Sequence, residues 1–141
     1  MSNHIMDSLY GALPLCCLAW RIDGQTEHRL QASADFQFGE AYPGFQGHFP
    51  EQPILPAIVQ LAAVRYLCEC ALGCDLLPKK YNKIKFKGII RPNERVVVTV
   101  DLADGAAGWH GSFSLRRPAG EMVASGSVDF FNKRDMDFAN T

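Results

Sequence analysis

One histidine of this chain lies in a loop whose prolines restrict the backbone. The loop reads Gly47-His48-Phe49-Pro50-Glu51-Gln52-Pro53-Ile54-Leu55-Pro56, with three prolines within seven residues. Each proline removes a backbone N–H and pushes the residue before it toward extended geometry. An imidazole titrates close to neutral pH, and a loop carbonyl can hold one ring nitrogen so that the other accepts a proton. His48 is therefore a candidate general base, and the alternative is that it only braces the loop.

The same loop leads into a long apolar stretch. Pro56 is a favoured residue in the first turn of a helix, and Gly73 is suited to its C-terminal end. We therefore expect a helix over residues 57–72. Its strongly polar residues are Gln60, Arg65 and Glu69. A helix that is apolar around nearly its whole circumference is expected to be covered by other structure on most sides.

Segments on both sides of this helix have the pattern of β-strands. Residues 15–22 favour a strand that ends at the turn pair Asp23-Gly24. Residues 26–38 alternate apolar and polar side chains, which indicates a strand with one buried face. Further strands are predicted over residues 81–90, 95–102, 109–116 and 121–131. Two strands, one long helix and then three or four antiparallel strands indicate the α+β class.

Length and composition limit the kinds of protein this chain can be. With 141 residues it is most simply one domain, with a core over about residues 15–131. A net charge of −1 gives no reason to expect nucleic acid or an anionic membrane as a partner. The five cysteines are odd in number and follow no secretory leader. We therefore expect a reduced, cytoplasmic protein without membrane insertion.

The cysteines of the predicted helix do not indicate a metal site. Cys68 and Cys70 are about 200° apart around a helix, so they cannot bind one ion together. We expect them to act as small, buried apolar side chains.

The order Gly-His-Phe-Pro-x-x-Pro-Ile-Leu-Pro resembles the signature of the β-hydroxyacyl-thioester dehydratases of bacterial fatty-acid synthesis. The sequence from Gln52 to Pro56 is most similar to that of dehydratases of specialised-lipid or aryl-polyene-type clusters. The resemblance implies the hotdog fold, in which a curved antiparallel sheet wraps a long central helix. It also implies an acyl carrier protein (ACP) or CoA thioester as substrate, no cofactor, and a homodimer or a heterodimer with another hotdog protein, with two sites across the interface.

The resemblance also assigns roles to residues of the loop and of the helix start. It makes His48 the base that removes the α-proton. It makes the backbone amide of Ala57, where the family has a glycine, the donor to the thioester oxygen. Phe49, Pro56 and Ile58 are expected to contact the acyl chain. An alanine amide at the positive end of the helix dipole can still serve as an oxyanion donor.

The general acid is where the chain departs from the family. The family has Glu or Asp six residues after the last proline of the motif, and this chain has Ala62 there; the glutamine that supports the acid is replaced by Tyr66. A methyl group cannot donate a proton, and loss of a general acid costs about 10² to 10⁴ in rate. Glu69 lies about 10 Å further along the helix axis. The remaining sources of a proton are Glu51, Tyr66 or a partner chain.

A short basic span gives the last candidate surface. We expect Lys83, Lys85 and Lys87 to share one face of a strand and, with Arg91, to bind an acidic carrier protein or CoA phosphates. The alternative is a solvated face that discourages pairing at the sheet edge. Three functions stay open at this point: a dehydratase-like lyase that obtains its acid from elsewhere, an acyl-thioester-binding or heterodimer subunit without catalysis, and a thioesterase on the same fold.

Overall fold

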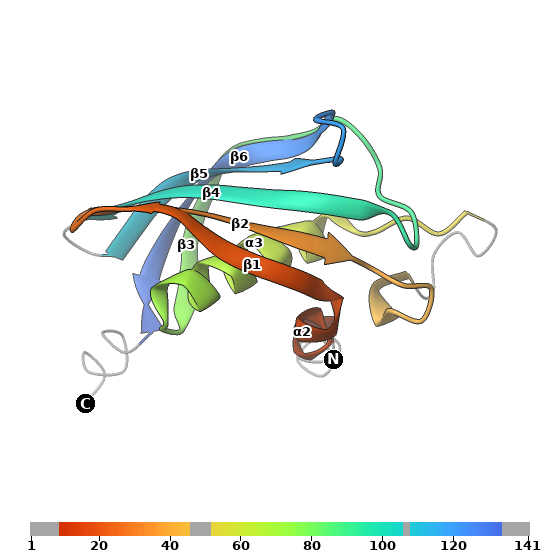
Figure 1. Ribbon diagram of the computed structural model, residues 1–141, viewed down its shortest axis with the longest axis horizontal. Coiled ribbons are helices and arrows are strands. Elements are labelled where there is room, and N and C mark those ends of the chain that lie inside the picture. Colours follow the sequence, from red (N-terminus) through yellow and green to blue (C-terminus); the bar gives the residue numbers. More distant parts are fainter. Residues whose placement is uncertain (1–8, 46–51, 106–107, 134–141) are drawn as a thin grey trace.

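A curved antiparallel sheet of six strands lies against one long helix (Figure 1). The computed structural model describes residues 9–45, 52–105 and 108–133. Its helices are α2 (Leu13–Cys16), the short 3₁₀ helix η1 (Pro43–Phe45) and α3 (Ala57–Leu72). Its strands are β1 (Cys17–Gln25), β2 (Arg29–Gln37), β3 (Leu76–Phe86), β4 (Arg95–Gly105), β5 (Gly108–Arg116) and β6 (Met122–Asn132). The expected hotdog architecture is confirmed.

The sheet has the order β1-β2-β4-β5-β6-β3, so β1 and β3 are its edges. The sequence predicts that this strand begins at Tyr81. In the structure β3 begins at Leu76 and includes Pro78. An edge strand tolerates a proline, because no further strand needs the missing N–H. The core lies between the sheet and α3 and also includes Leu13, two residues before the predicted start of the core.

α3 begins and ends where the sequence predicts. Pro56 precedes it with φ −62° and ψ 150°, and Gly73 ends it with φ 68° and ψ 30°, a left-handed conformation that favours glycine. The residues buried on α3 are Val59, Gln60, Ala63, Val64, Leu67 and Cys68. The other side is not covered to the same extent, since Ile58 is 50% exposed. The expected cover on most sides is therefore incomplete within this chain, because a single sheet buries only one face of a helix.

The first hairpin differs from its prediction. Residues 13–16 form a turn of helix, and β1 then runs straight through Asp23-Gly24. The chain reverses later, where the amide of Thr26 donates to the carbonyl of Arg29 at 2.8 Å. A register shift between Ile22 and Gly24 lets the strand include the glycine as an irregularity. The predicted turn is wrong because backbone pairing with β2 continues on both sides of the dipeptide.

Candidate active site

The loop that carries His48 joins α3 at Pro56. His48, Phe49 and Glu51 lie outside the described residues, so their roles stay predictions. Ala57 is the first residue of α3 and is exposed. The first amides of a helix have no partner within the helix, and the helix end attracts negative charge. The predicted oxyanion donor therefore lies where a helix offers its amides to a ligand.

A pocket of about 440 Å³ lies beside α3. Its lining residues are Leu9, Tyr10, Ile58, Val59, Leu61, Ala62, Arg65, Pro78 and Tyr81. Two of the predicted site residues, Ile58 and Ala62, share one wall because helix positions four residues apart lie on the same face. Most of the lining is apolar, which suits an acyl chain.

No carboxylate lines this pocket within the part of the chain that the structure describes. The position where the resemblance predicts the family acid is occupied by Ala62, whose side chain is a methyl group. Glu69 is committed elsewhere: it accepts hydrogen bonds from the hydroxyl of Tyr10 and, at 2.8 Å, from the amide of Leu76. Its Oε2 also lies 3.6 Å from Nε of Arg65. These contacts join the N-terminal segment and the start of β3 to α3, so Glu69 has a structural role.

Tyr66 contacts a different hollow from the one that Ala62 lines. Its ring meets those of Tyr10 and Phe36 edge-on, with centroid distances of 6.3 and 6.2 Å. It lines a second hollow that includes Cys70. Burial, together with a hydrogen bond to Cys70, raises the pKa of Tyr66 to about 12, so its hydroxyl is protonated at neutral pH. Within one chain the structure does not bring Tyr66 into the pocket of Ala62.

Three polar residues of the pocket are absent from the sequence-based site: Tyr10, Arg65 and Tyr81. The sequence alone could have placed Arg65 in the pocket, because Arg65 follows Ala62 by three residues and therefore lies on the same face of the helix. Tyr10 and Tyr81 come from the N-terminal segment and from β3. No local pattern indicates that either residue reaches α3.

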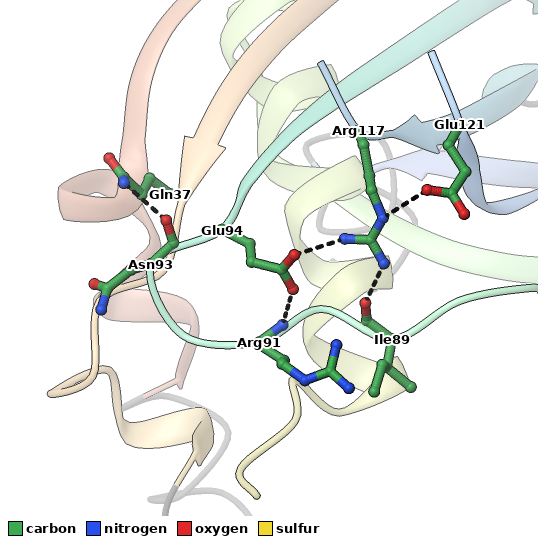
Figure 2. Close-up of polar contacts among 7 residues, drawn as sticks. All are labelled: Gln37, Ile89, Arg91, Asn93, Glu94, Arg117 and Glu121. Carbon is green, nitrogen blue, oxygen red and sulfur yellow. Dashed lines mark hydrogen bonds and ion pairs between the residues drawn. The ribbon is translucent and has the colours of Figure 1, made fainter. Parts of the chain in front are cut away.

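A network around Arg117 holds the segment between β3 and β4 (Figure 2). The guanidinium donates to the carbonyl of Ile89 at 2.7 Å, to Glu94 at 3.0 Å and to Glu121 at 3.1 Å. Glu94 in turn accepts a hydrogen bond from the amide of Arg91 at 2.6 Å. One arginine therefore holds Ile89 and Glu94 in the segment between β3 and β4, which has no regular secondary structure.

This segment supports the start of α3. The amide of Leu55, two residues before α3, donates to the carbonyl of Ile90 at 2.8 Å. Both side chains are buried in the core. The position of Ala57 therefore depends on a segment that Arg117 holds in place.

We expect Arg117→Met to lower the free energy of unfolding by about 1–3 kcal/mol, because it removes hydrogen bonds from a charged donor that is mostly shielded from water. The matched control is Glu121→Gln, which alters the most exposed partner, a side chain that is 72% exposed. That control should change the free energy by less than about 0.5 kcal/mol. Urea titration of both variants measures the difference. Equal losses would show that the contacts to Ile89 and Glu94 contribute nothing.

The basic surface lies at the edge strand β3. Lys83 and Lys85 line a hollow together with residues of β5 and β6, among them the exposed Ser112. Lys83 has φ 55° and lies within a register shift between Asn82 and Lys85. This bulge interrupts the regular alternation that the sequence predicts.

Lys87 and Arg91 lie apart from that hollow. Lys87 follows the end of β3, and its amide donates to the carbonyl of Val123 at 2.8 Å. The side chain of Arg91 is exposed in the turn before β4. The prediction that three lysines share one strand face is therefore wrong for Lys87, because β3 ends at Phe86. Carrier binding by these residues stays a prediction.

The described residues show neither a clustered set of metal ligands nor a membrane-spanning helix. Over residues 9–45, 52–105 and 108–133, no three His, Cys, Asp or Glu side chains come together as an ion would require. No helix in those ranges is long and apolar enough to cross a membrane. Cys68 is fully buried, and this burial raises the pKa of its thiol. Cys68 therefore packs as an apolar side chain, as expected, whereas Cys70 is only half-buried and the expectation of burial is wrong for it.

Comparison with known proteins gives one family and one fold. Residues 24–127 match a family described as ApeI-like, the ApeI dehydratase. The 3-hydroxyacyl-[acyl-carrier-protein] dehydratase FabZ of Natranaerobius thermophilus is 32% identical over 109 residues, which cover 71% of this chain and 74% of that protein.

Solved structures show the same fold at low sequence identity. The dehydratase heterocomplex ApeI:P from Xenorhabdus doucetiae matches with a TM-score of 0.65 and 16% identity, over 82% of this chain and 96% of that one. A hypothetical thioesterase with coenzyme A from Streptococcus pneumoniae matches with a TM-score of 0.61 and 8% identity, over 90% and 95% of the two chains. At these identities the likeness concerns the fold alone.

Proposed function

Because this chain belongs to the ApeI-like dehydratase family, we propose that it is a subunit of a 3-hydroxyacyl-thioester dehydratase that supplies the base, His48, and takes its acid from a partner subunit. The substrate is a 3-hydroxyacyl chain held as a thioester on ACP or CoA. A proton leaves the α-carbon and the hydroxyl leaves the β-carbon, so that a C=C bond forms and water is released.

The observation that carries this proposal is the methyl group of Ala62 in the wall of the pocket. The pocket has the apolar lining and the neighbouring helix start that an acyl thioester needs, and within the described residues it has no carboxylate. Glu69, the carboxylate of α3, is held by Tyr10, Leu76 and Arg65. A carboxylic acid for this step must therefore come from outside this set of residues.

Each step of the reaction then has a named group. His48 takes the α-proton, since an imidazole is a base near neutral pH. The amide of Ala57 donates to the thioester oxygen as negative charge develops there, and the helix dipole adds to this stabilisation. A carboxylic acid of the partner chain protonates the departing hydroxyl. Ile58 and Pro56 hold the acyl chain near the helix start.

The assembly in this proposal is a dimer of two hotdog chains with the site across the interface. Support comes from the side of α3 that the sheet leaves open, where Ile58 is 50% exposed. The ApeI:P structure from Xenorhabdus doucetiae is itself a heterocomplex. A partner with an intact helix acid would complete the site that contains His48.

The test mixes this chain with an acid-bearing dehydratase of the same family whose own catalytic histidine is replaced by alanine. Each protein alone should fail to dehydrate a 3-hydroxyacyl-CoA, and the mixture should produce the enoyl thioester, because only a mixed dimer combines His48 with a carboxylate. Mass spectrometry measures the product, and native mass spectrometry identifies the mixed dimer. A mixed dimer without turnover would contradict the catalytic role and leave a binding subunit without catalysis.

We expect the combined substitution Lys83→Glu, Lys85→Glu and Lys87→Glu to weaken binding of an acidic acyl carrier protein by roughly tenfold at low salt, and by less as salt screens the charges. The control reverses Arg21 and Arg95, which are exposed on β1 and at the start of β4. Surface plasmon resonance across a salt series measures both variants. Affinity that is unchanged at every salt concentration would make the lysines a solubility feature.

A further inference from the structure

Arg65 lies in the wall of the pocket beside α3. Its Nε is buried and makes no hydrogen bond within the described ranges. Its contact with a carboxylate is 3.6 Å long, from Nε to Oε2 of Glu69. The guanidinium carbon lies 4.6 Å from the centre of the Tyr10 ring, over one face. A buried guanidinium N–H that makes no hydrogen bond is costly unless a ligand supplies an acceptor.

Tyr81 gives the same part of the pocket a second donor. It lines the pocket from β3, and the positive charge of Arg65 acts against the burial that raises the pKa of Tyr81 to about 12. Its hydroxyl is therefore protonated at neutral pH and can donate. The hydroxyl of Tyr10 is already bonded to Glu69. Arg65 and Tyr81 thus form the available polar group of an otherwise apolar pocket.

The position of Arg65 along α3 determines how far Arg65 and Tyr81 lie from the thioester end of a bound acyl chain. Eight residues separate Ala57 from Arg65, which is about 12 Å at the rise of an α-helix. Ile58, Leu61 and Ala62 line the pocket between them. An extended chain advances about 1.2 Å per bond, so a thioester held at Ala57 would reach Arg65 after about ten bonds. This step rests on the proposed function, which places the thioester at Ala57.

We propose that this pocket selects acyl chains that carry an uncharged oxygen acceptor, a hydroxyl or a carbonyl, about ten bonds from the thioester, and that Arg65 is the residue that determines this specificity. A chain ending in a methyl group leaves the donors of Arg65 and Tyr81 unpaired, whereas a terminal oxygen satisfies them. A terminal carboxylate fits less well, because Glu69 already balances the charge of Arg65.

The test compares three CoA thioesters of equal chain length: decanoyl-CoA, ω-hydroxydecanoyl-CoA and the ω-carboxy analogue. Isothermal titration calorimetry on the full chain should show that the hydroxyl-ended thioester binds about tenfold more tightly than the methyl-ended one. The carboxyl-ended thioester should bind no more tightly than the hydroxyl-ended one. No preference among the three, no binding of any of them, or tightest binding of the carboxylate would overturn the proposal.

Variants of Arg65 separate specificity from stability. Arg65→Met keeps the length of the side chain but removes its donors, so it should abolish the preference while decanoyl-CoA still binds. Arg65→Lys should retain part of the preference, and Tyr81→Phe should reduce it. The control is Arg21→Met, on the exposed strand β1, which should leave all three affinities unchanged. A preference that survives Arg65→Met would assign the specificity to other residues.

The binding experiment and the turnover experiment test the two proposals separately. If the mixed dimer shows no turnover but Arg65 still gives a preference for the hydroxyl-ended thioester, the proposed dehydration is contradicted and the proposed specificity is supported. If the mixed dimer catalyses the reaction but binding shows no preference, only the proposed specificity is contradicted.

Discussion

Replacing Ala62 with glutamate should raise the dehydration rate of a 3-hydroxyacyl thioester by about 10² to 10⁴, the usual contribution of a general acid. The substitution restores a carboxyl group six residues after Pro56, in the wall of the apolar pocket. In a homodimer of the variant, each new carboxyl can meet the histidine of the other chain. Appearance of the enoyl thioester, followed by mass spectrometry, measures the gain.

Two features of the pocket act on the pKa of the new carboxyl in opposite directions. The apolar lining disfavours the charged form and raises the pKa, and the guanidinium of Arg65, three residues along the same face, lowers it. The carboxyl must be protonated to act as an acid. The gained activity should therefore fall as the pH rises through the pKa of the new carboxyl.

The matched control is Ala62→Gln, which has nearly the same size and shape but no acidic proton. Both variants place a polar group on an apolar surface and should lose similar stability, about 1–3 kcal/mol, which thermal melting checks. Only the glutamate variant should gain activity, and Tyr66→Gln can be added to orient the carboxyl as the family does. If the glutamate variant folds, binds the thioester and still shows no turnover, the pocket is not a dehydratase site.

Removing the imidazole with His48→Ala should abolish turnover in the mixed dimer, with a loss of about 10² to 10⁴ that corresponds to the general base. The same loss should appear when His48→Ala is added to Ala62→Glu. The KM for the thioester should change little, because the base acts on the proton and the apolar pocket binds the chain.

The control for this loss is His28→Ala. His28 is exposed between β1 and β2, where its ring contacts Asp104. That variant should keep full activity in the mixed dimer. Turnover that survives His48→Ala would mean that His48 only braces the loop, the alternative that its proline-rich surroundings also allow.

Some features of this protein follow from the sequence because short-range geometry decides them. The limits of α3 come from Pro56 and Gly73, and both act through their own backbone angles. The absence of an acid at position 62 follows from counting along the chain. Local signals fail where a longer-range pairing competes with them. Asp23-Gly24 is a good turn pair, but hydrogen bonds to β2 continue past it and move the turn to the residues after Thr26.

Only the tertiary structure decides what the polar residues of α3 do. The sequence places Glu69 and Arg65 on the helix. It cannot show that the hydroxyl of Tyr10 and the amide of Leu76 donate hydrogen bonds to the carboxylate of Glu69. The place of Tyr81 in the pocket likewise depends on how β3 packs beside α3. Positions along one helix are related by a fixed rise and rotation, so the sequence alone gives them. Contacts between distant segments depend on how whole elements pack, and no local pattern records that.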